Sequence, residues 1–409
     1  MNLEWSQEEK AFAEEIRAVL EQELTDDIRE ADRYATSVYP DHKASMAWQE
    51  RLHRNGLAAP HWPIEHGGKD WTAAQHYIFA SERARARAPS LSPMGIHMVA
   101  HVIAAFGTAE QQDFFLPRIL SGDVFFCQGY SEPNAGSDLA ALQMSAVPNG
   151  EDFLLSGSKI WTTHAQEANW IFCLVRTKNT GRRQEGITFI LVPMDQNGVT
   201  VHPITMLSGE TVQNQIFFAD VRVSRNNVIG EVDAGWRVAK YLLEFERGGS
   251  AYSAGLKIRV SDIEEQASTI AKGEGKLIDD PIFAHKLARA RIRVDILEVM
   301  ELRLLSSAGK GESVGAMSSL MKIMGTELAQ HLTELALEAA GPSGTVFQPH
   351  PTRPGAEIPD YTAPEDEYVS GATWQAVAPL QYLNERAGSI YAGSNEIQRN
   401  ILAKHVLGL

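Results

Sequence analysis

The chain has few cysteines, little basic charge and no long apolar run. Two cysteines in 409 residues are too few for a disulfide framework or a zinc cluster, which predicts a reducing compartment. A formal net charge of -15 disfavours nucleic acids and anionic membrane surfaces, because both attract basic residues. No window approaches the roughly 18 apolar residues of a membrane span, and the acidic first turns predict no signal peptide. We therefore expect a cytoplasmic protein.

Motifs for two common kinds of site are missing as well. No Gly-x-Gly-x-x-Gly follows an expected strand, so the sequence does not predict a Rossmann dinucleotide site. The scattered histidines, including His61, His66, His97 and His101, lack metal-ligand spacing such as His-Glu-x-x-His. We interpret them as structural or surface residues and expect no metal site.

Hydrophobic periodicity divides the chain into three expected domains. Residues 1–124 have helical spacing and begin with a capping box at Ser6 and Glu9. Residues 125–234 contain short runs rich in β-branched and aromatic residues between turns, which predicts a small β-barrel or sandwich. Residues 235–409 return to long helical segments that suit a four-helix bundle. The expected fold is therefore mostly α with a central β domain.

The pattern also predicts individual elements and two loops. The expected helices after the first are Ser45–Asn55, Ala73–Arg87, Met94–Phe106, Trp236–Phe245, Ala251–Ala271, Pro281–Ser307, Ser318–Ala340 and Trp374–Leu383. The expected strands are Phe153–Ser156, Trp170–Val175, Ile187–Val192, Val199–Ile204 and Gln215–Val223. Lys272–Pro281 is a polar helix break, and Pro342–Gly371 is a long proline-rich loop. For the second loop, an ordered interface and a mobile segment both remain open.

The segment Gln128–Leu142, QGYSEPNAGSDLAAL, resembles the first signature of acyl-CoA dehydrogenases, Ser-Glu-x-x-x-Gly-Ser-Asp after an aromatic residue. The resemblance implies bound FAD, with Gln128, Tyr130 and Ser131 along the flavin edge and Ser137 at flavin or pantetheine. Such an arrangement is chemically reasonable, because negative charge gathers on the pyrimidine edge of a reduced flavin and requires hydrogen-bond donors. Taken alone, the segment could also be a Ser/Gly-rich turn between domains.

A second motif, Lys159-Ile160-Trp161-Thr162-Thr163, resembles the Trp-x-Thr of the same family. There the indole lies against the flavin and the threonine hydroxyl reaches the N5 edge, where the hydride is accepted. The resemblance implies these roles for Trp161 and Thr163. A strand with a core tryptophan is the alternative interpretation, and the spacing after the first motif favours the functional one.

The C-terminal segment Gly388–Leu409 resembles the closing signature of the family. The resemblance assigns Ser394 and Glu396 to cofactor binding. In most members a glutamate in this loop removes the α-proton of the thioester, and here that position is Ala392. The main-chain NH of Ala392 can still donate to the thioester carbonyl, because an amide survives the substitution.

A branch of the family carries its base on the first bundle helix instead, in a Glu-Arg pair that Glu246-Arg247 matches. The resemblance makes Glu246 the best candidate for the base, with Glu244 and Arg247 at the substrate. Abstraction of a weakly acidic α-proton requires a desolvated carboxylate with a raised pKa. The alternative is that Glu246 is an ordinary surface acid or a salt-bridge partner.

The resemblance as a whole implies FAD-dependent α,β-desaturation of an acyl-CoA thioester to trans-2-enoyl-CoA, as in β-oxidation of fatty acids. Electrons would pass to an electron-transfer flavoprotein. Two other hypotheses remain: a non-catalytic or half-site subunit of a hetero-oligomeric dehydrogenase, or a flavin-dependent desulfinase or oxidase on the same fold. The acyl group is open among dicarboxylyl, branched, steroid side-chain and plain fatty acyl.

Two departures from the family pattern concern assembly. Homotetrameric members complete a neighbour's FAD site with an arginine before Phe-Gly and with Gln-x-x-Gly-Gly-x-Gly. Here residues 271–276 contain no arginine, and the second motif has Glu338 for the glutamine and Pro342 for a glycine. An acid disfavours a nearby pyrophosphate, and proline has no NH to donate. The pattern resembles the large subunit of pimeloyl-CoA dehydrogenase, so we expect a tetramer with a sister chain. A homotetramer is the alternative.

Overall fold

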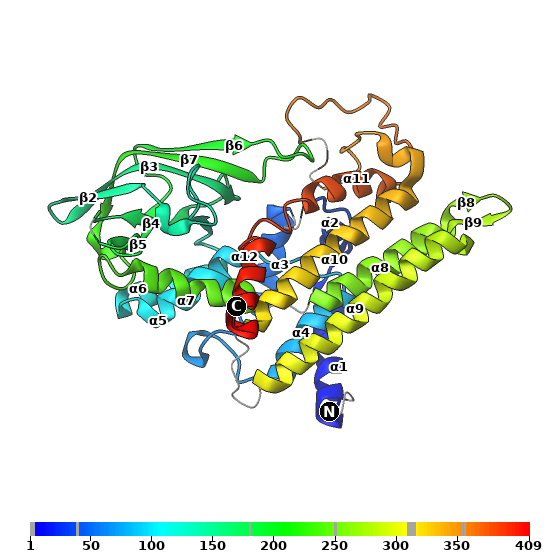
Figure 1. Cartoon of the computed structure of the whole chain (residues 1–409), viewed down its shortest axis with the longest axis horizontal. Helices are drawn as coiled ribbons and strands as arrows, with labels where there is room; N and C mark the ends of the chain where they lie inside the picture. The colour runs from blue at the N-terminus through cyan, green and yellow to red at the C-terminus, as the bar shows by residue number, and fades with distance from the viewer. Residues whose placement is uncertain are drawn as a thin grey trace. The chain divides into compact units, whose positions relative to one another are not determined.

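The computed structural model describes residues 5–37, 41–179, 181–248, 252–308, 316–353, 355 and 357–409. Its contacts group the chain into two compact units. The helical unit consists of Met1–Ala44, Asp70–Ser90 and Gly249–Leu409, and the β unit of Ser45–Lys69 and Leu91–Gly248. The first quarter of the chain is therefore shared between the two units (Figure 1).

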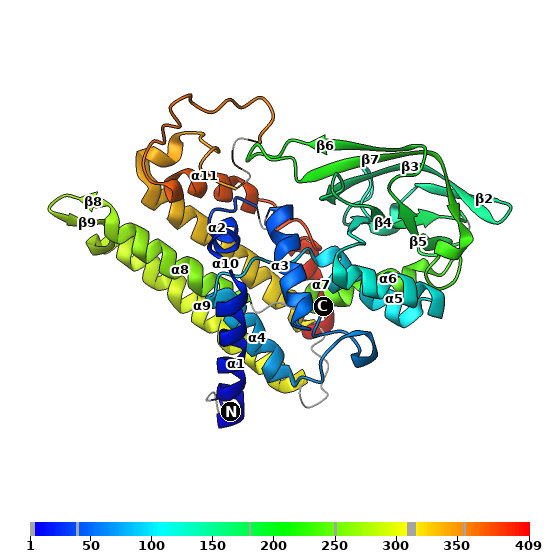
Figure 2. The same ribbon diagram turned by 180° about the vertical axis from the view of Figure 1, so that it is seen from behind.

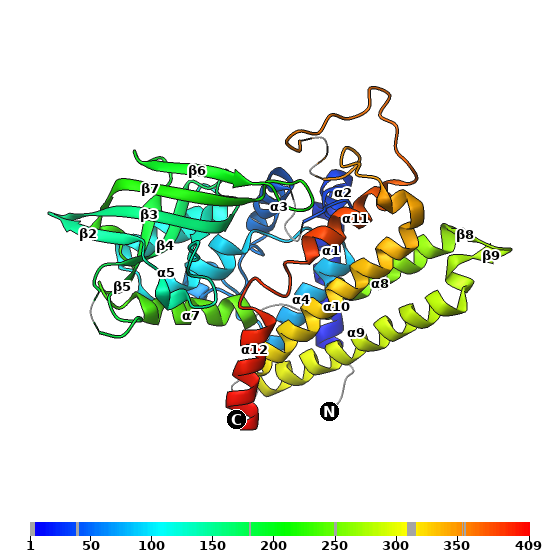
Figure 3. The ribbon, with the colours of Figure 1, turned by 45° about the horizontal axis from the view of Figure 1, so that its top comes forward.

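The β unit is built on one seven-stranded sheet. Its strands are β1 Phe126–Gly129, β2 Ser145–Asn149, β3 Asp152–Thr163, β4 Trp170–Arg176, β5 Ile187–Pro193, β6 Val199–Ile204 and β7 Gln213–Ser224. The order is β1-β4-β2-β3-β7-β6, with β5 paired to β4. Strands β3, β7 and β6 are antiparallel neighbours (Figure 3), whereas β1 and β4 run parallel. The expected β domain is confirmed, and it is a mixed sheet.

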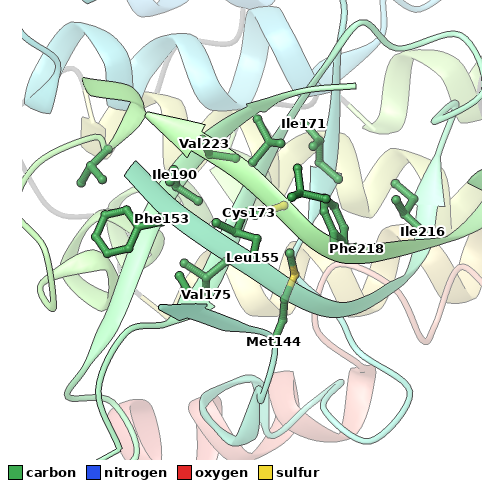
Figure 4. Packing of buried hydrophobic residues seen from close by; sticks show 14 of the residues in the cluster. Met144, Phe153, Leu155, Ile171, Cys173, Val175, Ile190, Ile216, Phe218 and Val223 are labelled. Carbon is green, nitrogen blue, oxygen red and sulfur yellow. The ribbon is translucent and has the colours of Figure 1, made fainter. Parts of the chain in front are cut away.

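The core of the β unit lies where the sheet's inward-facing side chains meet (Figure 4). It includes Met144, Phe153, Leu155, Ile171, Cys173, Val175, Ile190, Ile216, Phe218 and Val223. Strands β4 and β5 are buried along almost their whole length, because both of their faces are covered. The helices of this unit are α3 His42–Arg54, α5 Ala100–Phe106, α6 Ala109–Ser121, α7 Gly235–Gly248 and the π-helical segment Met94–Val99.

The helical unit packs long helices from the C-terminal part of the chain against N-terminal ones. Its helices are α1 Gln7–Glu23, α2 Asp26–Arg33, α4 Ala73–Arg85, α8 Tyr252–Thr269, α9 Pro281–Ala308, α10 Met317–Ala340, α11 Thr373–Glu385 and α12 Asn395–Leu402. The capping box of α1 is confirmed, since the backbone NH of Ser6 donates to Glu9 at 2.7 Å and the NH of Glu9 donates to Ser6 Oγ at 3.2 Å. Figure 2 shows α1 beside α4, and the hairpin β8–β9 (Ala271–Lys272 and Gly275–Lys276) joins α8 to α9.

Two findings refine the sequence-based organisation. Helix α7 follows the expected domain boundary at residue 234, yet it is part of the β unit by its contacts. Helix α6 was not predicted, because Pro117 lies inside it and proline disfavours helix interiors. A Thr108–Gln111 capping box was the available signal for its beginning. Within the described residues, no helix is both long and apolar enough to cross a membrane.

The proline-rich loop is tied together near its two ends. Gln348 is buried, donates to the carbonyl of Ser370 at 2.9 Å and accepts the backbone NH of Ser370 at 2.8 Å. Inside the loop, a 2.7 Å hydrogen bond joins His350 Nδ1 to the Tyr361 hydroxyl, and the two rings stack. These contacts give the loop an internal structure of its own.

Candidate functional site

The first motif begins on β1 and continues into the loop that follows it. Gln128 pairs with Phe172 across the parallel β1–β4 ladder and is half-buried. The Tyr130 side chain is buried, with its ring against those of Phe172 and Phe189. The phenol ring of Tyr130 therefore belongs to the core of the β unit. Ser131 is half-buried, and its carbonyl accepts the NH of Ile160 at 2.9 Å.

A β-bulge places the second motif. Lys159 pairs with Ile216 on β7, but Thr162 pairs with Asn214, so β3 has one extra residue between these positions. Trp161 occupies the bulge with φ +60°, a left-handed conformation that side chains rarely adopt. Its side chain is 58% exposed, whereas the two threonines that follow are buried. The bulge thus turns an indole outward from the sheet.

A buried ion pair connects the two motifs. The Lys159 ammonium is fully buried and donates to Glu132 Oε1 at 2.8 Å, to the Leu174 carbonyl at 2.7 Å and to the Tyr130 carbonyl at 3.2 Å. Glu132 also accepts the backbone NH groups of residues 143 and 144 at 2.7 and 2.9 Å. Burial lowers the pKa of Lys159, and the charge of Glu132 opposes that shift. Glu132 therefore anchors the loop of the first motif.

Thr163 and Thr162 are held by two consecutive amides at the start of β7. Gln213 Nε2 donates to Thr163 Oγ1 at 2.9 Å. Asn214 Nδ2 donates to the Thr162 carbonyl at 3.1 Å. An exposed indole, a half-buried serine and a threonine hydroxyl with its own hydrogen still available suit the ring of a flavin, which needs an apolar face and donors at its edge.

Ser137 lies in the exposed part of the first motif's loop. Beside it, Asp138 forms a 2.6 Å ion pair with Arg183, and both side chains are largely exposed. An exposed serine at this place is accessible to a ligand that covers the loop.

The tail loop of the helical unit carries three further candidates. Ala392 has φ +53° and Gly393 has φ +79°, so two successive residues adopt the left-handed conformation. Ser394 is the N-cap of α12 and accepts the NH of Ile397 at 3.4 Å. Glu396 is exposed in the first turn, where hydrogen bonds from its own backbone NH and then from Ser394 lower its pKa.

Asn395 holds this tail on α10 and was not singled out from the sequence. It is buried, accepts a hydrogen bond from Lys322 Nζ at 2.9 Å and donates to Thr326 Oγ1 at 3.2 Å. Asn395 is 73 positions from Lys322 and 69 from Thr326 in the chain. A polar residue inside the recognised tail motif was the only sequence signal for it.

The candidate base lies at the limit of what the structure describes. The backbone of α7 extends to Gly248 and so includes Glu244, Glu246 and Arg247. The side chains of these three residues lie outside the described residues. Their roles therefore remain predictions from the sequence.

A buried acid in the helical unit had no sequence signal. Glu301 on α9 accepts the backbone NH of Ser253 at 3.1 Å and the Ser253 hydroxyl. The Tyr77 hydroxyl is 3.3 Å from Ser253 Oγ. Burial raises the pKa of Glu301 to about 7, although the bonds from Ser253 act in the opposite direction. The acid satisfies the free NH groups at the start of α8.

Three family models match successive parts of the chain. Residues 6–123 match "Acyl-CoA dehydrogenase, N-terminal domain", residues 127–221 match "Acyl-CoA dehydrogenase, middle domain", and residues 233–407 match "Acyl-CoA dehydrogenase, C-terminal domain". Together these matches span nearly all of the sequence.

Curated relatives and solved structures agree with these matches. Acyl-CoA dehydrogenase IpdE1 of Mycobacterium tuberculosis is 36% identical over 366 residues, covering 89% of this chain and 87% of the relative. FadE26 of the same organism is 31% identical over 419 residues, covering 100% and 99%. The ChsE4-ChsE5 complex from M. tuberculosis has a TM-score of 0.81 at 30% identity, and the Tcur3481-Tcur3483 steroid ACAD has 0.82 at 25%. Both structures cover 100% of this chain and 99% of their own.

We predict that Lys159→Met strongly destabilises the protein. The change leaves the Glu132 carboxylate and two carbonyls buried without their donor, and breaking a buried pair costs about 3–5 kcal/mol. The free energy of unfolding, from urea titration of wild type and variant, measures this loss. Arg183→Met is the matched control, because it breaks the exposed pair with Asp138 and should change stability little. Similar losses in both variants would contradict the anchor role.

We predict that Glu301→Gln stabilises the protein above about pH 5, by an amount that grows until about pH 7. The raised folded-state pKa means that stability is fully present below the ordinary value of 4.5 and is lost as pH rises through about 7. Each pH unit between these values removes about 1.4 kcal/mol. The glutamine mimics the neutral acid and escapes this loss, so its thermal midpoint should exceed that of wild type at pH 8 and match it near pH 4. Glu274→Gln, in the exposed β8–β9 turn, serves as the control.

Proposed function

The chain belongs to the acyl-CoA dehydrogenase family, and we propose that it desaturates the α,β bond of an acyl-CoA thioester to trans-2-enoyl-CoA. It is an FAD-dependent oxidoreductase that acts on acyl-CoA. The observation that carries the proposal is the bulge in β3, which exposes the indole of Trp161 two residues before the buried hydroxyl of Thr163. A flat ligand on the indole would have this hydroxyl near its edge.

The reaction separates a proton from a hydride, and FAD supplies the acceptor for the hydride. Residues of the β unit hold the ring: Trp161 offers a face, while Thr163 and Ser131 offer hydroxyl groups. By the family pattern, we assign to the backbone NH of Ala392 the hydrogen bond to the thioester carbonyl, which becomes more negative as the α-proton leaves. None of these groups accepts the α-proton, so the reaction also needs a carboxylate that acts as the base.

We assign that carboxylate to Glu246. Ala392 has no ionisable group, so the position that carries the base in most members cannot supply it here. Glu246 lies on α7, and its pairing with Arg247 matches the branch of the family that carries its base on this helix. Glu244 and Arg247 lie one turn or less away and are proposed to contact the substrate.

We propose that the acyl group is bulky or polar at its far end, such as a steroid side chain or a dicarboxylyl chain. Support comes from the similarity to a structure named as a steroid ACAD, at 25% identity over the whole chain. The electrons are proposed to pass to an electron-transfer flavoprotein, as the family pattern implies.

Anaerobic titration of the purified protein against an acyl-CoA panel tests the reaction and the substrate class. Steroid side-chain and dicarboxylyl thioesters should bleach the flavin's visible absorption and yield enoyl-CoA by mass spectrometry, with plain fatty acyl thioesters much slower. Glu246→Gln should slow bleaching roughly a hundred- to ten-thousand-fold, whereas Glu265→Gln on the exposed face of α8 should not. Thioester consumption without enoyl-CoA would favour the desulfinase or oxidase hypothesis, and unchanged bleaching in Glu246→Gln would exclude this base.

We further propose that a sister chain completes the FAD site. Glu338 is engaged by Lys286 at 2.8 Å, so it has a structural partner in place of a phosphate contact. Pro342 lies in the first turn of the 3-10 helix Gly341–Thr345 and offers no NH. Residues 271–276, which by the family pattern correspond to a segment with an arginine in homotetrameric members, contain none and form the β8–β9 hairpin. A solved neighbour is named as a complex of two different proteins, ChsE4 and ChsE5.

Mass and flavin content of the chain purified alone test this assembly. We expect well under one FAD per chain, because the contacts that a neighbour normally supplies would be missing. Light scattering gives the mass, and absorbance of the released flavin gives the stoichiometry. A stable homotetramer with one FAD per chain would instead support self-sufficient assembly.

A further inference from the structure

Gln213 makes a single directed contact with the second motif. It is the first residue of β7 and pairs with Thr163 across the β3–β7 ladder. Its Nε2 donates to Thr163 Oγ1 at 2.9 Å. Its Oε1 is buried, and within the described residues no donor reaches it. Within the described residues, the side chain of Gln213 is therefore linked to the second motif only by its hydrogen bond to the Thr163 hydroxyl.

The direction of this hydrogen bond follows from the burial of the amide. With Nε2 toward Thr163, one amide hydrogen is used and only the carbonyl oxygen lacks a partner. This orientation leaves only a carbonyl oxygen without a partner, and an under-satisfied buried carbonyl is commoner than a buried NH without a partner. Gln213 is thus the donor and Thr163 the acceptor.

An accepted hydrogen bond leaves the Thr163 hydroxyl with its own hydrogen. A hydroxyl has one hydrogen and two lone pairs, and Gln213 occupies one lone pair. In the described part of the chain, no acceptor takes the hydrogen of Thr163. The neighbouring amide of Asn214 donates to the Thr162 carbonyl at 3.1 Å, which fixes the backbone beneath the hydroxyl. The hydroxyl is therefore held as a donor for a ligand.

We propose that Gln213 is a positioning residue that fixes the Thr163 hydroxyl as a hydrogen-bond donor toward the flavin. This inference rests on the proposed function, because it takes Thr163 to lie at the flavin edge. Without Gln213 the hydroxyl rotates freely, and with an acceptor in its place the hydrogen turns away from the ligand. Gln213 is fifty positions from Thr163 in sequence. The side chain at position 213 therefore affects the rate at which the flavin accepts a hydride.

Two substitutions separate these cases. Gln213→Met removes the donor at similar length, and Gln213→Glu is isosteric but accepts from Thr163 when ionised. Each is made in the wild-type and in the Thr163→Val background. Gln215→Met is the matched control, because it makes the same change two residues along β7; among the described residues, the β7 side chains that bond to Lys159–Thr163 are Gln213 and Asn214.

The first readout uses no substrate: the visible and resonance Raman spectrum of the FAD-loaded, oxidised enzyme. Both Gln213 variants should shift it, with the larger shift in Gln213→Glu, and neither should shift it further once Thr163 is valine. The second readout is the rate of anaerobic reduction by the best acyl-CoA, which should fall roughly three- to tenfold in Gln213→Met. Gln215→Met should change neither.

Equal effects of the Gln213 variants with and without the Thr163 hydroxyl would overturn the proposal, as would an unchanged spectrum. The spectral test remains valid if no thioester reduces the flavin, so failure of the proposed reaction and failure of this inference are distinguishable. If Gln213→Met does not fold, Gln213→Glu decides alone, because its side chain has the same size as that of glutamine.

Discussion

The site of the β unit depends on the hydrogen bonds that the buried ammonium of Lys159 donates. It is fully buried, yet it satisfies the carboxylate of Glu132 and the carbonyls of Tyr130 and Leu174 together. Glu132 in turn accepts two backbone NH groups at residues 143 and 144. A loop with this many buried polar groups is stable only if each has a partner. One side chain of β3 therefore holds the shape of the first motif, and the two motifs fold as one structure.

The bulge in β3 links this buried network to the exposed side chain of Trp161. The NH of Ile160, inside the bulge, donates to the carbonyl of Ser131 in the first motif's loop. Trp161 then adopts a left-handed conformation that exposes its indole, and the strand resumes with Thr162 and Thr163 buried. Such a conformation is costly for a large side chain and persists only where surrounding contacts fix it. Here those contacts come from the first motif and from the amides of β7.

Much of the fold was predictable because its signals are local. Capping residues and apolar spacing predicted most helices, and β-branched runs predicted five of the strands. The short strands β1 and β2 lacked such signals, since β1 is a four-residue strand fixed by its pairing with β4. Helix α7 was predicted as a helix, but its place in the β unit depends on packing. Gln213, Asn395 and Glu301 were missed as a group, because each acts through partners 48 to 73 positions away.

The sequence alone determined the family, the cofactor and the residue types at the site, because these depend on motifs of adjacent residues such as Lys159–Thr163. It could not determine how those residues are used. The tertiary structure decided that Glu132 anchors a loop, that the Tyr130 ring is core and that Thr163 accepts from Gln213. Hydrogen-bond direction, burial and the pKa of an acid such as Glu301 depend on groups distant in sequence. Only the folded chain brings those groups together.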